Sequence, residues 1–180
     1  IIKKVRKKKR ILALLLAAGL RFGIFPLNVS ASESASPASI EEMQIYITDE
    51  RLENPDVIMN GNPQSGSLQR DASYLVSCNI SAAYMSYGLY IQTETGTTKT
   101  ASERGVKDIK VQQKNGIFWT TIATSGGGSI TNDDWFLGSC ECKNAVDGEI
   151  YRIKCTHFAY IGGNYYHYDN TSDPFTYVKP

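Results

Sequence analysis

The feature that most constrains the fold is the lack of helical periodicity after Leu68. Beyond that point, β-branched and aromatic residues recur in runs that end at clusters of Gly, Asn, Asp and Ser, a pattern typical of antiparallel sandwiches and barrels. The runs predict strands at 74–80, 83–93, 106–114, 117–124, 135–143, 149–160 and 175–179. About 110 residues suffice for one core. Residues 69–180 are therefore predicted to form one all-β domain, a single antiparallel β-sandwich of about seven strands.

The Asp147-Gly148 dipeptide predicts a two-residue hairpin turn between the strands 135–143 and 149–160. In that register, apolar or small residues share one face, and a slip of one residue would turn both faces over. The expected pairs on this face are Phe136 with Ala159, Gly138 with His157, Cys140 with Cys155 and Cys142 with Ile153.

A second hairpin is predicted at Asn115-Gly116, with two alternative turns. A two-residue turn places Phe118 on the core face, whereas a three-residue loop with a bulge at Gly116 places Trp119 there. We favour the bulge because Trp is the more usual core anchor.

The N-terminal residues 1–31 have the pattern of a signal peptide. A basic stretch from Lys3 to Arg10 precedes an unbroken apolar run from Ile11 to Leu20. This run is shorter than the roughly 20 apolar residues of a membrane-spanning helix. Val29-Ser30-Ala31 suits cleavage before Ser32. We expect a secreted or cell-envelope protein, and membrane contact only through this segment if it stays uncleaved as an anchor.

Residues 32–68 are predicted to be an acidic flexible linker or pro-segment. They hold seven acidic residues and one Arg, and little apolar surface to offset the entropy of ordering. The alternating stretch 43–47 could form one short strand. Residues 70–180 carry ten basic and eleven acidic residues, a balance that argues against nucleic acid as a partner.

All four cysteines, Cys78, Cys140, Cys142 and Cys155, fall in the predicted domain. Export makes disulfides the favoured state, and the register above pairs Cys140 with Cys155 and leaves Cys142 for Cys78. Free buried thiols are the second alternative. A zinc site that includes His157 is the third, although two ligands at i and i+2 lack the usual loop of structural zinc sites.

The sequence shows no Gly-x-Ser-x-Gly elbow, His-Glu-x-x-His motif or phosphate-binding loop. Cys155 and His157 could form a dyad, but their strand face is predicted to be buried, where a thiol is inert. We therefore expect no catalytic residues, no cofactor and no metal. A small secreted hydrolase is the weaker alternative.

Binding is better supported than catalysis. The segment 160–175 is predicted to be a loop that exposes Tyr165, Tyr166 and Tyr168 together, beside Asp169. Exposed tyrosines offer stacking surfaces for sugar rings and polar tips for hydroxyls. Asp169, with Asn170 and Asp173, could also supply oxygen ligands to a weak Ca²⁺ site. The sequence thus predicts a non-catalytic module that binds an extracellular glycan or protein. A structural or immunity-type envelope protein is the alternative.

Three stretches carry a resemblance to known proteins. They are Arg70-Asp71-Ala72-Ser73-Tyr74-Leu75, then Ile109-Lys110-Val111-Gln112 with Asn115-Gly116 and Trp119, and Asp147-Gly148-Glu149-Ile150-Tyr151-Arg152-Ile153 followed by His157. Together they resemble a family of small exported proteins of Gram-positive bacteria with no assigned activity. The resemblance covers about residues 70–180. It implies export and an all-β domain, and it transfers no catalytic residue.

Overall fold

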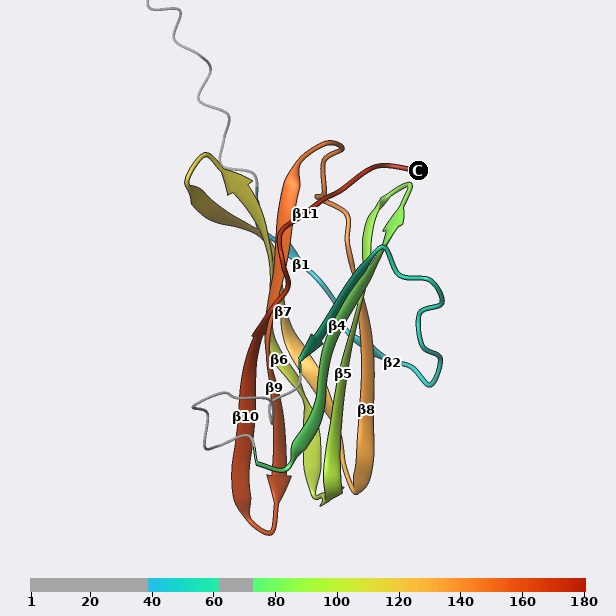
Figure 1. Cartoon of the computed structure of the whole chain (residues 1–180), viewed down its shortest axis with the longest axis vertical. Coiled ribbons are helices and arrows are strands. Elements are labelled where there is room, and N and C mark those ends of the chain that lie inside the picture. Colours follow the sequence, from blue (N-terminus) through green and yellow to red (C-terminus); the bar gives the residue numbers. More distant parts are fainter. Residues whose placement is uncertain (1–38, 62–72) are drawn as a thin grey trace, which may run out of the picture. The chain divides into compact units, whose positions relative to one another are not determined.

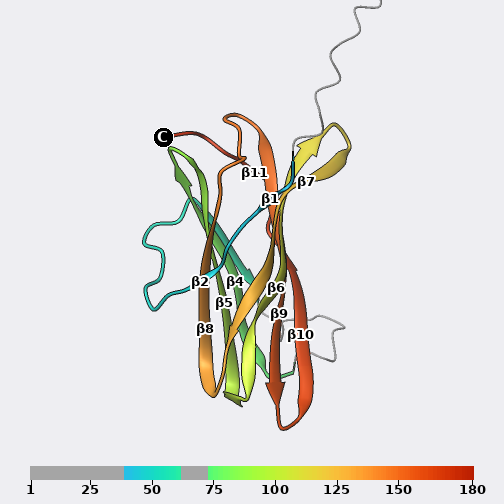
Figure 2. The same cartoon turned by 180° about the vertical axis from the view of Figure 1, so that it is seen from behind.

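The computed structural model describes residues 39–61 and 73–180, which belong to one compact unit, Ala38–Pro180. The described residues form two β-sheets packed face to face (Figures 1 and 2). This confirms the predicted all-β sandwich. Nowhere in 39–61 or 73–180 is there a helix long and apolar enough to cross a membrane. The predicted signal peptide, residues 1–31, lies outside the described residues.

The sheets divide eleven strands between them. Sheet A has the order β1-β7-β6-β9-β10, with β11 also paired to β9, and sheet B has the order β2-β8-β5-β4-β3. All pairs are antiparallel except β1 with β7. The bounds are β1 Glu41–Glu42, β2 Tyr46–Ile47, β3 Val57–Gly61, β4 Leu75–Met85, β5 Gly88–Ala101, β6 Glu103–Asn115, β7 Phe118–Ile130, β8 Asp133–Cys142, β9 Ile150–Ile161, β10 Asn164–Thr171 and β11 Phe175–Thr176.

The core lies between the two sheets, and the long strands of both sheets contribute inward-facing residues to it. Sheet B supplies residues such as Ile91 and Phe136, and sheet A supplies Val111, Tyr151 and Ile153, all fully buried. Each buried large apolar side chain contributes about 1.5–3 kcal/mol relative to exposure. The alternation of apolar and polar residues along a strand therefore determines which of its faces is buried.

The predicted pairing across Asp147-Gly148 is wrong. The turn forms, since the amide of Glu149 donates to the carbonyl of Val146 at 3.3 Å. However, β8 pairs with β5 and β2, whereas β9 pairs with β6, β10 and β11, so the turn joins the two sheets instead of two strands of one sheet. Both strands present an apolar face to the same core, and that alternation matches equally well for facing sheets and for paired strands.

The Asn115-Gly116 prediction is also corrected. Asn115 pairs with Phe118, so the two-residue turn is Gly116-Ile117, with Gly116 at φ +60°. Phe118 is 70% exposed and Trp119 is half-buried. Neither residue is the core anchor. A bulge between Val111 and Gln112 shifts the register, and the buried residue of β7 opposite Val111 is Ala123.

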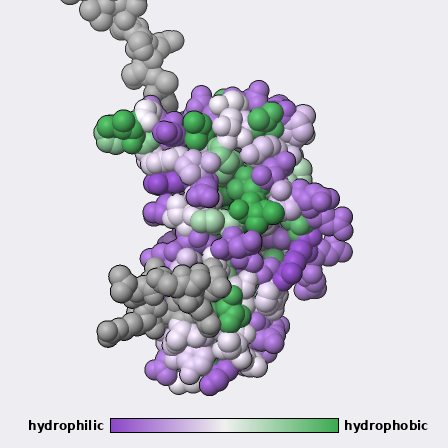
Figure 3. Space-filling model, viewed as in Figure 1, coloured by the Kyte–Doolittle hydropathy of each residue, from purple (hydrophilic) through white to green (hydrophobic). Residues whose placement is uncertain are grey.

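The flexible linker predicted at 32–68 is wrong for its described part, 39–61. This part supplies β1 to sheet A, and β2 and β3 to sheet B. Between β2 and β3, residues 48–56, here called the strap, lie against the outer face of sheet B. Gln92 holds the strap by accepting from the amide of Leu52 at 2.8 Å and donating to the carbonyl of Glu50 at 2.9 Å. The strap forms part of the hydrophilic right-hand margin in Figure 3.

Two further boundaries differ from the prediction. The predicted strand 83–93 contains the turn Ser86-Tyr87 that joins β4 to β5. The predicted loop 160–175 contains β10, which forms a hairpin with β9 through Gly162-Gly163. Both glycines have positive φ, +59° and +79°, as a two-residue hairpin turn requires. The Gly-Gly pair was the sequence signal for this hairpin.

Candidate functional site

The four residues predicted to bind a ligand all lie on or at the end of β10, but not on one face. Tyr165 and Asp169 point outward from sheet A, with His167 between them, whereas Tyr166 and Tyr168 point toward sheet B. Tyr166 packs edge-on against Tyr74, with ring centroids 4.8 Å apart. The three tyrosines are therefore not exposed together. The prediction failed because a strand alternates its side chains, whereas a loop need not.

The outward residues of β9 and β10 form an aromatic cluster, defined as Phe158, Tyr160, Tyr165 and His167. The Tyr165 ring lies 6.2 Å from Phe158, 5.0 Å from Tyr160 and 5.4 Å from His167, measured between centroids. The ammonium of Lys107 lies 5.2 Å from the same ring centroid. Tyr165 is thus fixed by packing at the centre of the cluster, and Tyr160, 38% exposed, presents more of its surface to solvent.

Next to this cluster, an irregularity in β6 brings charged side chains together. The register between β6 and β9 shifts between Lys107 and Lys110, and Asp108 at the bulge has φ +55°. Positive φ is unfavourable for residues with a side chain, and it concentrates where function requires it. Bulges redirect side chains next to sites in the same way.

The bulge opens onto a shallow pocket of about 450 Å³, here called the polar pocket. The lining residues come from β6, β9 and β10, and they are Asp108, Lys110, Lys154, Cys155, Thr156, Asp169, Asn170 and Thr171. Thr156 donates to Asp169 at 2.6 Å. Among the residues that the structure describes, the two carboxylates and two ammonium groups form no ion pair with one another or with other side chains. The pocket thus offers hydrogen-bond donors and acceptors of both charges to a ligand.

The oxygen donors proposed for calcium do not converge. Asp169 faces outward, whereas Asn170 faces inward and donates its side-chain amide to the carbonyl of Cys78 at 2.6 Å. In the described part of the chain, no three His, Cys, Asp or Glu side chains are placed to hold a metal ion.

All four cysteines are buried and free, so the structure contains no disulfide where the sequence favoured two. Cys140 and Cys155 lie on different sheets, and the register that paired them does not exist. Burial raises the pKa of Cys140 and of Cys142 to about 12, and it raises the pKa of Cys78 further. These thiols behave as small apolar side chains.

A chain of hydrogen bonds runs through the core at Cys155, His157 and Thr95. The Thr95 hydroxyl donates to the carbonyl of Gly105 at 3.0 Å and lies 2.8 Å from Nδ1 of His157. Because its proton is used, Thr95 accepts from Nδ1–H, and Nε2 then accepts from the Cys155 thiol at 3.3 Å. Burial lowers the pKa of His157 to about 3 and raises that of Cys155. The pair is neutral and sealed from water.

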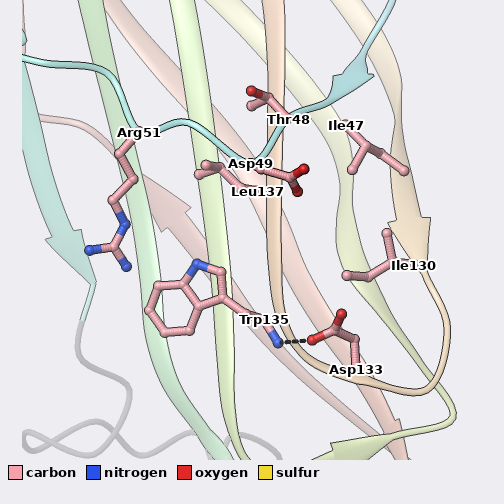
Figure 4. A pocket seen from close by; sticks show the side chains of 8 residues that line it. All are labelled: Ile47, Thr48, Asp49, Arg51, Ile130, Asp133, Trp135 and Leu137. Atoms are coloured by element: carbon pink, nitrogen blue, oxygen red, sulfur yellow. Dashed lines mark hydrogen bonds between the residues drawn. The ribbon is translucent and has the colours of Figure 1, made fainter.

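A second pocket of about 210 Å³ lies beside the strap (Figure 4). Asp49 and Asp133 point into it, with Trp135 on one side. The guanidinium of Arg51 lies 4.7 Å from the Trp135 ring centroid and pairs with Glu94 at 3.0 Å. Arg51 therefore covers one face of the indole, and its charge is already paired with Glu94. This pocket thus offers fewer unpaired charged groups to a ligand than the polar pocket does.

Comparisons with models of known protein families, with curated proteins and with solved structures found no match. The resemblance to the exported Gram-positive family therefore stays a prediction. Of the residues that line the polar pocket, sequence reasoning named Asp169 and Asn170 as ligand candidates, and Cys155 for other roles. Asp108, Lys110 and Lys154 were missed because the bulge and the β6–β9 pairing that gather them join distant segments.

Proposed function

We propose that this chain is exported and that its β-sandwich is a non-catalytic extracellular module that binds a glycan in the polar pocket. Export is supported by the basic stretch and apolar run of residues 1–31. Binding is supported by a preformed pocket on the outer face of sheet A.

One observation carries the proposal. Asp108, Lys110, Lys154 and Asp169 surround one pocket without neutralising one another. Each sugar hydroxyl both donates and accepts a hydrogen bond, so a ring of ammonium, hydroxyl and carboxylate groups suits it. The volume of the pocket falls in the range usual for small-ligand sites. Tyr160, exposed in the adjoining aromatic cluster, adds an apolar surface of the kind that stacks on sugar rings.

The burial of His157 and Cys155 supports a binding role over hydrolysis. His157 is 0% exposed, and its low pKa keeps the imidazole unprotonated, so it does not generate the thiolate that a nucleophile requires. A structural or immunity-type role requires neither a pocket nor an exposed aromatic side chain. The polar pocket and the exposed ring of Tyr160 therefore favour binding.

Binding is tested with the purified chain on an array of immobilised glycans, followed by calorimetry with the best ligand. The decisive variant is Asp108→Gly, because glycine removes the carboxylate while favouring the positive φ. Asn132→Gly is the matched control, with φ +55° at the turn before β8 and away from the pocket. We expect Asp108→Gly to weaken binding at least tenfold and Asn132→Gly to leave it unchanged. No glycan bound, or equal binding by both variants, would refute the proposal.

Export is tested separately. Mass spectrometry of the protein recovered from culture medium and from the envelope of producing cells gives the N-terminus of the mature chain. A chain that begins at Ser32 supports signal-peptide cleavage. Protein confined to the cytoplasm with residues 1–31 intact refutes export.

A further inference from the structure

The turn between β6 and β7 exposes two adjacent large apolar side chains. Ile117 is 87% exposed and Phe118 is 70% exposed, although both residues lie in a well-formed hairpin. The end of this hairpin projects away from the two sheets (Figures 1 and 2), and an apolar patch stands at the corresponding upper left of Figure 3. Exposed apolar groups of this kind mark interaction sites.

Along the hairpin beyond the bulge at Asp108, the charge has one sign. From Ile109 to Ile130 the chain carries two charged residues, Lys110 and Lys114, and no acidic residue. A third positive charge is added by Arg152, whose guanidinium lies 4.3 Å from the centroid of the Trp119 ring. Arg152 also donates from Nε to Gln112 at 2.8 Å, which fixes it on the hairpin.

The hairpin therefore carries apolar side chains at its tip, and the indole of Trp119 lies one residue pair further in, at the level of Lys114 and Arg152. The same order is found at the surface of an anionic bilayer, where apolar groups enter the acyl boundary, Trp prefers the headgroup level, and Lys or Arg contacts phosphates. A soluble acidic protein would match the lysines, but it would not require the two exposed side chains at the tip to be apolar.

We propose that the β6–β7 tip is a membrane-contact site that inserts Ile117 and Phe118 into the interface of an anionic lipid bilayer. Two apolar side chains give weak, reversible contact alone. The described chain enters the sandwich beside this hairpin, since β1 pairs with β7 at Ala123 and Thr124. Any membrane attachment of the preceding sequence would raise the effective concentration of the tip at the bilayer.

The test uses Trp119 as the reporter. The chain has two Trp residues, so Trp135→Phe leaves Trp119 alone. The full chain is mixed with phosphatidylglycerol vesicles that contain lipids brominated on the acyl chains, and tryptophan quenching is measured. We expect at least twofold quenching, and much less with phosphatidylcholine vesicles. Ile117→Ser with Phe118→Ser should abolish it, even where the N-terminal segment still holds the chain on the vesicle.

Ile58→Ser is the matched control, because Ile58 is 61% exposed on β3, in the other sheet. The Trp119 fluorescence of this control should be quenched as much as that of the parent. Circular dichroism should show that all variants remain folded. The proposal is overturned if the parent is not quenched or if the double serine variant is quenched equally. It is also overturned if light scattering shows a dimer that the double variant loses, because the tip would then bind a second copy of the chain.

Discussion

Sγ of Cys155 lies 3.3 Å from Nε2 of His157, two residues further along β9, and both side chains are sealed in the core. In sequence the pair looks like a nucleophile with its base. In the structure the imidazole is the acceptor for the thiol proton, and burial stabilises the neutral forms of both groups. The pair contributes buried hydrogen bonds, and its exposure on unfolding can be measured.

The four thiols should be unreactive in the folded protein. All are buried, and burial raises the pKa of each, so the thiolate fraction at pH 8 is very small. With Ellman's reagent we expect fewer than one thiol to react within minutes in native buffer and four to react in 6 M guanidinium. Rapid reaction of the native protein would contradict the arrangement of the core.

Stability should fall as the pH is lowered from 6.5. The pKa of His157 is about 3 in the folded chain, against 6.5 for an exposed imidazole. Below pH 6.5, His157 binds a proton in the unfolded chain but not in the folded chain. This difference lowers the free energy of unfolding by about 1.4 kcal/mol per pH unit. We expect urea titrations to show about 2 kcal/mol less stability at pH 5 than at pH 7.

His157→Gln should remove most of this pH dependence, because carboxylates stay ionised above pH 5. If this variant does not fold, the imidazole NMR resonances of the parent give the answer. The chemical shifts of the His157 imidazole should not change between pH 7 and 5. Titration there would refute the assignment.

Arg104 should destabilise the fold. It is fully buried on β6, and none of its three side-chain nitrogens has a hydrogen-bond partner among the described residues. Burial lowers the pKa of Arg104, and the charges of Asp133 and Asp134 oppose the shift. Since an unsatisfied buried polar group costs about 1–3 kcal/mol, and a charge more, Arg104→Met should raise the free energy of unfolding by about 2 kcal/mol.

The control for Arg104 is the same substitution at Arg152, which has partners. Arg152→Met loses the contact with Trp119 and the hydrogen bond to Gln112, so it should give no gain. Denaturant titrations of both variants decide the matter. A loss of stability in Arg104→Met larger than that in Arg152→Met would show that the buried guanidinium is stabilising.

Glu41 should anchor β1 to the sandwich. Its carboxylate accepts from the amide of Lys143 at 3.0 and 2.8 Å and from the amide of Asn144 at 2.8 Å. Hydrogen bonds to charged groups contribute about 1.5–3 kcal/mol. Glu41→Ala should therefore cost about 2 kcal/mol and speed proteolysis near residue 43. The exposed neighbour Glu42 serves as the control, and equal effects of Glu42→Ala would refute the role of the anchor.

The sequence was enough to predict the elements near turns, because turn chemistry and the period of two are local. Gly148 and Gly116 lie at real turns with positive φ. It did not predict which sheet receives each strand, since Phe136 and Ala159 are inward-facing whether their strands pair or face each other. Only the hydrogen bonding of each strand edge decides between these, and it leaves no trace in a hydrophobicity pattern.

For the candidate site, too, features within one strand could be predicted, and contacts between distant strands could not. Tyr165 and Asp169 were predicted to act together, and they do share a face, because they are four residues apart on one strand. Tyr166 and Tyr168 lie on the opposite face of the strand because of the same alternation. Lys110 and Lys154 meet through strand pairing over more than forty residues, and Asp108 joins them through a bulge. The acidic segment 39–61 looked unstructured because its order comes from contacts with distant residues, such as Gln92 with the strap. Only a few dispersed apolar residues of the segment, Met43 and Val57 among them, are buried in the core.

The way in which this segment enters the fold has a mechanical consequence. β1 is held on sheet A by two residue pairs and by the Met43 amide at 2.7 Å from the Thr124 carbonyl. Glu41 ties β1 to the amides that follow β8, and β2 and β3 belong to sheet B. A force applied from the amino-terminal side reaches β1 first and stretches the link between the layers only after β1 detaches. Tension would thus first release a short segment that can rebind, before the strands that form the two sheets separate.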